Sequence, residues 1–393
     1  MRKSSLYRFY VLMFMEVVAA NMVHPVTPTF LTDLQMPEYM FGAAFAAMSL
    51  TNFLFCPFWG AMGDGIGRVK TLVITIAGYA FGQLMFFYST TIWQILVARM
   101  IAGVFSGGCT VSLMAYVADT ADPDQCGKHM AICAALTSAA IAVGYLVGGL
   151  LGDIAVRVAF LSQVGVLCLS SAGMGLFLLD GAHYRRQRIN ISRAANPFSV
   201  FTDSRELFSF PMTVFLVTVF LGCFASTAYD NAFNYYLKDQ FRFPPSYNGY
   251  IYAAIGVVGI SVNMTLGLWL QRKTDGRFPL AVIFVAAGLA LAASLKISQV
   301  GFYIAVNMIF YVCNSMYLPL QQALAIRQGK GDHGTISGVF SSVRAAGMVS
   351  GSLSAGFLYE IAPLLTMGVC AIVFFVTAAI VLFNRYQYKE GKR

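Results

Sequence analysis

Charged residues are scarce in this chain. They make up 11% of its 393 residues, against about 25% in an average soluble domain. So few charges cannot cover the surface of a soluble protein of this length, and the hydrophobic share of 58% agrees with that. The apolar runs are long and continuous, whereas the strands of a membrane β-barrel alternate over about ten residues. We therefore expect an all-α membrane protein with several spans.

Signatures of catalysis and of metal binding are also missing. The eight cysteines form no CxxC pair, and most of them lie inside apolar runs, where cysteine is typically a small packing residue. No nucleophile and base, no phosphate-binding loop and no cluster of metal ligands is visible. We expect no bound metal, no cofactor and no enzymatic activity.

Long apolar segments are abundant, and each can cross a bilayer. The longest polar break, 181–208, divides the chain into a first bundle, 1–180, and a second bundle, 209–393. The first run has a basic start but no small-residue cleavage site, so we interpret it as a retained span rather than a signal peptide. The twelve expected spans are 7–31, 41–62, 70–89, 92–118, 129–152, 158–180, 209–237, 247–270, 278–297, 300–326, 335–358 and 362–384.

Basic residues are distributed unevenly between the two sides. Twenty of the 26 Lys and Arg residues fall in segments that are cytoplasmic if the N-terminus is inside, and four fall in outer segments. Because positive residues favour the cytoplasmic side, both termini are expected there. The net charge of +9 then reflects topology and contact with the lipid bilayer, and we expect no nucleic-acid partner.

The two bundles resemble each other in sequence. ADPDQCGKHMAICAALTSAAIAVGYLVGG precedes and fills the fifth span, and IRQGKGDHGTISGVFSSVRAAGMVSGSLSAG does the same for the eleventh. Each begins with a polar, glycine-containing loop and continues with small residues along a helix. Two six-span repeats are typical of a transporter that works by alternating access, with its substrate site near the bilayer midplane.

A charged, glycine-rich loop joins the second and third spans. It reads GAMGDGIGRVK and contains Gly60, Asp64, Gly67 and Arg68. It resembles the signature loop of the major facilitator superfamily, usually GxxxDRxGRR. The resemblance implies the twelve-helix fold of that family, and a conformational latch in which Asp119, at the end of span four, joins the loop's charges.

Two further motifs resemble those of proton-coupled members. Span four contains an RxxxG motif, which begins at Arg99. Span five contains Gly144, Gly148 and Gly149, which are similar to a motif of drug:proton antiporters, with Tyr145 in place of its proline. These glycines are also expected to allow close helix packing whatever the function.

Bacterial exporters of quinolones and tetracyclines are similar to this chain at VHPVTPTFL in span one and at AYDNAFNYYLKD in span seven. In some of these exporters a span-seven carboxylate lies in the central cavity, and Asp230 occupies that position. The resemblance implies a proton-coupled secondary transporter that exports amphiphilic small molecules or drugs, works as a monomer and resides in a bacterial cytoplasmic membrane.

Glu16 and Asp230 are the acids that fall well inside expected spans, and Arg99 and Arg344 are the bases. A buried charge costs at least about 2.5–3.5 kcal/mol, so it should be paired, protonated or exposed to water. One interpretation is a static ion pair between such residues. The other is that Glu16 or Asp230 carries the coupled proton. Arg344 could balance an acid or bind an anionic substrate.

A continuous first helix would place His24 about 80° around the axis from Glu16 and two turns along it. Both would then face one cavity. Aromatic and methionine side chains suit adaptable binding of varied molecules. The candidate substrate-binding residues are His24, Arg99, Asp230, Asn231, Asn234, Tyr235, Gln321 and Arg344.

Other functions stay open on the sequence alone. One is a proton symporter for a small anionic or zwitterionic solute. A second is a translocator of lipids or lipid precursors, and a third is a sensor that binds a ligand without moving it.

Overall fold

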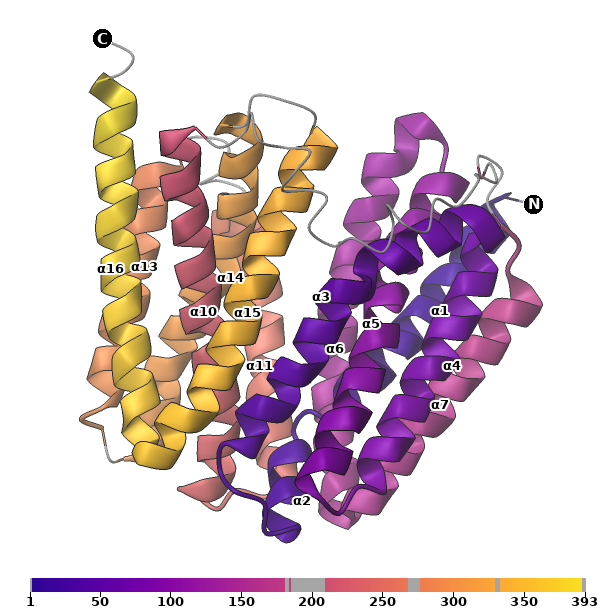
Figure 1. Ribbon diagram of the computed structural model, residues 1–393, viewed down its shortest axis with the longest axis horizontal. Coiled ribbons are helices and arrows are strands. Elements are labelled where there is room, and N and C mark those ends of the chain that lie inside the picture. The colour runs from indigo at the N-terminus through magenta and orange to yellow at the C-terminus, as the bar shows by residue number, and fades with distance from the viewer. Residues whose placement is uncertain are drawn as a thin grey trace. The chain divides into compact units, whose positions relative to one another are not determined.

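The structure is a computed structural model that describes residues 2–180, 184, 209–267, 276–297, 299–328 and 333–390. Throughout these residues the chain is helix and connecting turn, without β-strands. Apart from Tyr184, the expected linker 181–208 lies outside them. The twelve long helices are α1 (Arg2–Met22), α3 (Met40–Ile66), α4 (Arg68–Phe87), α5 (Ile92–Thr120), α6 (Cys126–Ile154), α7 (Val156–Phe177), α10 (Phe210–Asp239), α11 (Pro245–Val262), α13 (Arg277–Ser294), α14 (Val300–Gln328), α15 (His333–Ile361) and α16 (Pro363–Glu390) (Figure 1).

These helices correspond one by one to the expected spans, which confirms the fold class. Eleven segments among the described residues are long and apolar enough to cross a membrane. The remaining long helix, α15, has 29 residues and corresponds to the expected span 335–358. Its many Ser and Gly residues, together with Arg344, make it less apolar than the others.

The sequence predicted one continuous helix for the first span, but the structure shows a break. α1 ends at Met22 and a short helix, α2 (Thr27–Asp33), begins after a turn. Pro25 lies in this turn and has no amide hydrogen to donate to a helix. The Val23 carbonyl accepts hydrogen bonds from the amides of Val26 (3.0 Å) and Thr27 (2.8 Å) and from the Thr27 hydroxyl (2.8 Å).

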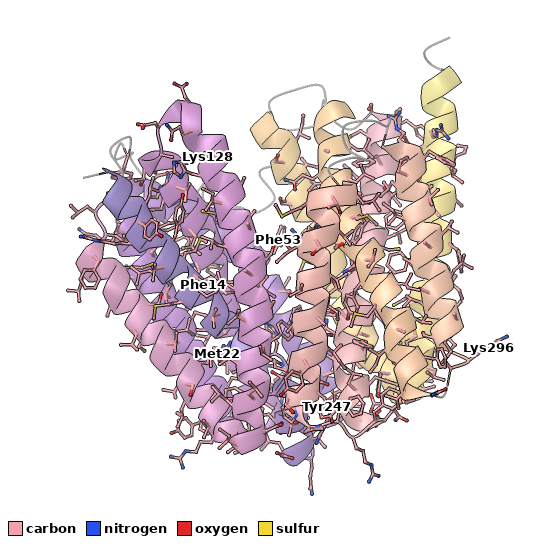
Figure 2. The ribbon with its side chains drawn as sticks, turned by 180° about the vertical axis from the view of Figure 1, so that it is seen from behind. Phe14, Met22, Phe53, Lys128, Tyr247 and Lys296 are labelled. Atoms are coloured by element: carbon pink, nitrogen blue, oxygen red, sulfur yellow. The ribbon has the colours of Figure 1, made fainter. Side chains whose placement is uncertain are left out.

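The described helices form two compact units. Unit 1 comprises Met1–Met36, Ala47–Pro197 and Arg242–Gly256, and unit 2 comprises Pro37–Ala46, Phe198–Phe241 and Val257–Arg393. The start of α3 therefore packs with unit 2, and the start of α11 packs with unit 1. Figure 2 places Lys128 and Tyr247 at opposite ends of unit 1. This agrees with the sequence-based topology, which puts Lys128 inside and Tyr247 outside.

Each unit is held together by helices that pack along their lengths. In unit 1, α1 packs against α6 and α7, and α4 packs against α5 and α7. Its core includes Phe9, Met13, Ile76, Tyr116 and Leu167, all fully buried. In unit 2, α10 packs against α15 and α16, and α13 packs against α14 and α16.

Glycines bring α6 very close to its neighbours in unit 1. A Cβ atom added at Gly144 would lie 2.5 Å from the Val18 carbonyl oxygen, and one at Gly148 would lie 1.7 Å from the Met22 carbonyl oxygen. On another face of α6, a Cβ at Gly149 would lie 3.0 Å from the Cα atom of Gly249 in α11. No side chain fits at Gly144 or Gly148 without moving the α1 backbone.

We therefore expect Gly148→Ala to destabilise unit 1. Overpacking a closely packed site costs about 1–3 kcal/mol, occasionally more. The midpoint of thermal unfolding of the detergent-purified protein should fall by several degrees. Gly165→Ala is the matched control, because a Cβ atom at Gly165 in α7 would meet no atom within 4 Å. Equal unfolding midpoints for the two variants would contradict this account of the α1 and α6 contact.

Candidate functional site

Unit 1 contains a cavity of about 280 Å³ with a single carboxyl group in its wall. That group belongs to Glu16 on α1, whose side chain is 4% exposed. His24, from the turn after α1, lines the same cavity, so the two residues do share it although the helix between them is broken. The other polar residues of the wall are Asn21, Asn52, Tyr79, Ser106, Thr110 and Thr137, together with the thiol of Cys109.

The Glu16 carboxylate has no hydrogen-bond or ion-pair partner among the described residues. Tyr79 lies near it on α4, but the Tyr79 hydroxyl is engaged elsewhere. It accepts a hydrogen bond from Gln83 Nε2 (2.7 Å) and donates to the Ala20 carbonyl (3.4 Å). An unpaired carboxylate at this depth is costly. Glu16 can therefore gain stability by binding a proton or a cationic group of a ligand.

Arg99 is buried in the same unit, and none of the described residues that contact its guanidinium is an acid. Its guanidinium carbon lies 3.8 Å above the centre of the Phe86 ring. One terminal nitrogen lies 3.5 Å from the Thr27 hydroxyl and the other 3.7 Å from the Met48 sulfur. Its Nε has no hydrogen-bond acceptor in the described part of the chain. A static ion pair between Glu16 and Arg99 is therefore absent from this arrangement.

The tyrosine that replaces the motif proline has a defined place in unit 1. The Tyr145 ring on α6 stacks on the His24 ring at a centroid distance of 5.6 Å and on the Tyr252 ring of α11 at 4.6 Å. This stack joins the turn after α1, α6 and the start of α11. Stacked rings contribute attraction beyond their buried area, so Tyr145 fixes the orientation of the His24 imidazole beside the cavity.

The candidates of unit 2 have more partners. Asp230 Oδ1 accepts a hydrogen bond from the Tyr311 hydroxyl (2.8 Å). Asn231 donates to the Ser352 hydroxyl (3.1 Å), and Tyr235 stacks on Phe41.

Three other candidates of unit 2 differ in burial. Gln321 is fully buried and donates to the Thr218 carbonyl (3.1 Å). Asn234 is half-buried, one turn after Asp230 on α10. Arg344 is half-buried beside Cys223 and Tyr317.

The charged loop between α3 and α4 brings all its predicted residues together. Arg68 forms an ion pair with Asp64, and its Nε donates to Asp119 Oδ2 at 2.8 Å. Another guanidinium nitrogen donates to the Gly60 carbonyl at 3.3 Å. Gly67 has a φ of +109°, which side-chain-bearing residues rarely adopt. One arginine thus bridges two helices, the arrangement that a latch requires.

Acidic residues also meet in unit 2, around Glu38 in the segment before α3. Burial and the nearby carboxylates of Asp239 and Glu360 raise the pKa of Glu38. Asp239 also accepts a hydrogen bond from the Tyr359 hydroxyl at 2.8 Å. Surroundings that raise the pKa of a carboxyl group stabilise its protonated form relative to its charged form.

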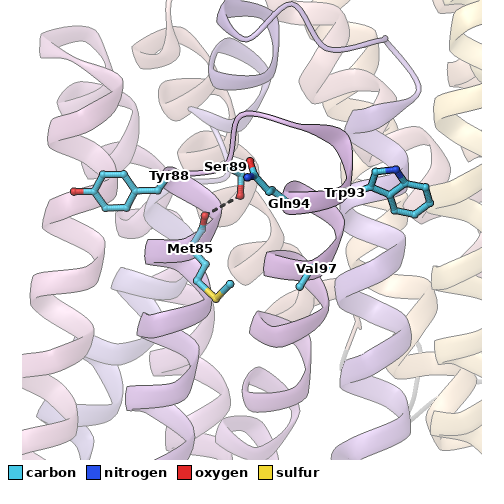
Figure 3. A pocket seen from close by; sticks show the side chains of 6 residues that line it. All are labelled: Met85, Tyr88, Ser89, Trp93, Gln94 and Val97. Carbon is cyan, nitrogen blue, oxygen red and sulfur yellow. Dashed lines mark hydrogen bonds between the residues drawn. The ribbon is translucent and has the colours of Figure 1, made fainter.

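A second cavity, of about 410 Å³, lies at the turn between α4 and α5 (Figure 3). Its wall is formed by Met85, Tyr88, Ser89, Trp93, Gln94 and Val97. The Ser89 hydroxyl donates to the Met85 carbonyl at 2.8 Å. None of these residues is ionisable at neutral pH and none belongs to a predicted motif. We therefore take the Glu16 cavity as the candidate site.

Comparison with known proteins identifies the family. A family model described as the major facilitator superfamily matches residues 9–352. The chain belongs to the major facilitator superfamily. It is a multi-pass membrane transporter of small molecules and not an enzyme.

Individual relatives are distant but span most of the chain. The tetracycline resistance protein, class C, of Escherichia coli is 25% identical over 353 residues, which are 88% of this chain and 87% of that protein. Multidrug resistance protein 2 of Bacillus subtilis is 20% identical over 348 residues, with 88% and 87% covered. A bacterial homologue of the human lysosomal transporter Spinster superposes with a TM-score of 0.79 at 13% identity, covering 98% of this chain and 97% of that one.

Several residues that line the Glu16 cavity were not predicted from the sequence. Tyr79, Asn52, Ser106, Cys109 and Thr137 line the Glu16 cavity. They are ordinary small or polar residues in helices that pack together only in the folded unit. Helical periodicity shows which residues of α1 share a face with Glu16, but it does not show which residues of other helices lie opposite that face.

If the Glu16 cavity binds ligands, a cysteine in its wall should be shielded by them. Consider a variant in which Thr137→Cys supplies the sole thiol. Saturating tetraphenylphosphonium, a lipophilic cation, should slow its reaction with a maleimide severalfold, because the ligand occupies the space before the thiol. A variant that keeps Cys168 alone, exposed on α7, is the control and should react at an unchanged rate. Binding of the cation without any protection at position 137 would place the site elsewhere.

Proposed function

We propose that this protein is a proton-coupled exporter of amphiphilic small molecules, drugs included, in a bacterial cytoplasmic membrane. The observation that carries the proposal is the Glu16 carboxylate, which lines a cavity among membrane-spanning helices without a partner in the described chain. The similarity to tetracycline and multidrug resistance proteins supports the outward direction.

The wall around Glu16 suits amphiphilic cations. Met48 and Met114 supply adaptable apolar surface, and Tyr79 and His24 supply rings next to the acid. A carboxylate beside aromatic rings attracts a cation through both charge and ring quadrupole. Proton and cation compete for the same carboxylate, which couples their movements.

The transport cycle follows from that competition. Protonation of Glu16 from the outside displaces the substrate. The protonated transporter returns to the inward-facing state and releases the proton to the cytoplasm, and the free carboxylate then accepts a new substrate. The bridge from Arg68 to Asp64 and Asp119 stabilises one of the two conformations, as a charged latch can. Asp230 is the second candidate for carrying the proton.

Glu16→Gln removes the titrating group and keeps its size. In liposomes with an acidic lumen and a pH-sensitive dye, proton efflux triggered by tetraphenylphosphonium should fall by at least about tenfold, equivalent to about 1.4 kcal/mol. Asp124→Asn, at an exposed acid in the turn before α6, is the matched control and should transport as the wild type does. An unchanged dependence on the pH gradient in Glu16→Gln would refute its coupling role. Loss in Asp230→Asn alone would move that role to Asp230.

Arg99 favours a second candidate function, the transport of an anionic or zwitterionic solute by proton symport. A buried guanidinium without a carboxylate can be completed by an acidic group of a substrate, and a hydrogen bond to a charged group contributes about 1.5–3 kcal/mol. Such a solute would bind with its acid towards Arg99, Thr27 and the wall residue Met48.

Arg99→Gln separates the two candidates. If substrates carry an acidic group to Arg99, this variant should bind anions and zwitterions about tenfold more weakly or worse and bind lipophilic cations as before. Arg157→Gln, at an exposed arginine of α7, is the matched control. Binding can be followed by titration calorimetry in detergent. Equal affinities of wild type and Arg99→Gln for every anion tested would eliminate the second candidate.

A further inference from the structure

The segment that follows α7 contacts the loop between α3 and α4 and the end of α5. We call Leu178, Leu179, Asp180 and Tyr184 the α7 exit. The Val69 amide donates to Asp180 Oδ1 at 2.9 Å, and the Tyr184 hydroxyl donates to the Asp64 carbonyl at 3.0 Å. All of these residues belong to unit 1.

The other two residues hold the α7 exit in place. The Leu179 carbonyl accepts a hydrogen bond from the Tyr116 hydroxyl at 3.1 Å. The Leu178 side chain is 3% exposed and lies in the core of unit 1. Asp180 is therefore presented to the loop from a fixed backbone, although its own side chain is exposed.

Asp180 fits the loop at a position that only glycine allows. A Cβ atom at Gly67 would lie 2.3 Å from Asp180 Oδ2, so the carboxylate sits directly over the Gly67 backbone. Gly67 precedes α4, and the Val69 amide is one of the helix-start donors that lack a partner within the helix. A carboxylate at a helix start also interacts favourably with the helix dipole. Asp180 thus fixes the first turn of α4, which carries Arg68.

The α7 exit and the latch share residues. Asp64 is held through its side chain by Arg68 and through its carbonyl by Tyr184. On α5, Tyr116 contacts the α7 exit and Asp119, three residues later, contacts Arg68. The α7 exit therefore contacts both helices that carry the acidic partners of Arg68, α3 with Asp64 and α5 with Asp119.

We propose that the α7 exit positions the latch, with Asp180 as the positioning residue. When the bond from Val69 to Asp180 is lost, the start of α4 loosens and fewer molecules keep Arg68 bridged between Asp64 and Asp119. The rate of the conformational cycle then changes, while substrate affinity does not, because no residue of the α7 exit lines the Glu16 cavity. The effect on rate rests on the proposed transport function; the anchoring of the loop does not.

Hydrogen exchange and transport together test this role in the full-length protein. In Asp180→Ala, exchange of the Val69 amide should be at least about tenfold faster than in the wild type. Asp180→Asn keeps an acceptor oxygen at the same place and should restore most of the protection. Asp124→Ala removes an exposed acid from the turn before α6 and is the control that should change nothing.

Transport is measured on the same variants as proton efflux triggered by tetraphenylphosphonium. Asp180→Ala should change the maximal rate severalfold and leave the dissociation constant of the cation unchanged. Unchanged exchange at Val69 in Asp180→Ala would overturn the proposal, and so would faster exchange with an unchanged maximal rate. If the wild type moves no protons with any compound, the proposed transport function fails. Exchange in Asp180→Ala and Asp180→Asn then still decides whether Asp180 anchors the loop.

Discussion

The cost of placing a charge among membrane-spanning helices governs this structure. Each such charge costs at least about 2.5–3.5 kcal/mol on insertion, so nearly all Asp, Glu, Lys and Arg residues lie between the expected spans or near their ends. There Arg68 can bridge Asp64 and Asp119, because polar surroundings lower the cost of bringing three charges together. The same constraint makes Glu16 and Arg99 informative, since a fold that tolerates charges at this depth must use them or lose stability.

Close packing places the helices that form the Glu16 cavity of unit 1. Gly144 and Gly148 let α6 approach the backbone of α1 at Val18 and Met22. Glu16, two residues before Val18, is thereby held against a wall drawn from α3, α4, α5 and α6. The glycines that resemble a transport motif thus have a packing role that would be needed whatever the substrate.

The sequence predicted features that depend on local composition and missed those that depend on contacts between distant segments. Runs of mostly apolar residues predicted the twelve helices, including α15 with its many Ser and Gly residues. The spacing from Gly60 to Arg68 indicated the charged loop. The break in the first span was missed because its apolar residues continue through Pro25. Asp180 was missed because its partner, the Val69 amide, is a backbone group more than a hundred residues away. An acid just after a span gives no signal of the loop that it contacts.

The break after Met22 contributes to the surroundings of both Glu16 and Arg99. Tyr79, on α4, lies near both charges. The turn at residues 23–26 directs His24 into the cavity and begins α2 with Thr27, whose hydroxyl lies by Arg99. Phe86 and Met48 complete the surroundings of the guanidinium. Because Arg99 is retained there, the Glu16 carboxylate stays available to a proton or a cation, which a paired carboxylate would not be.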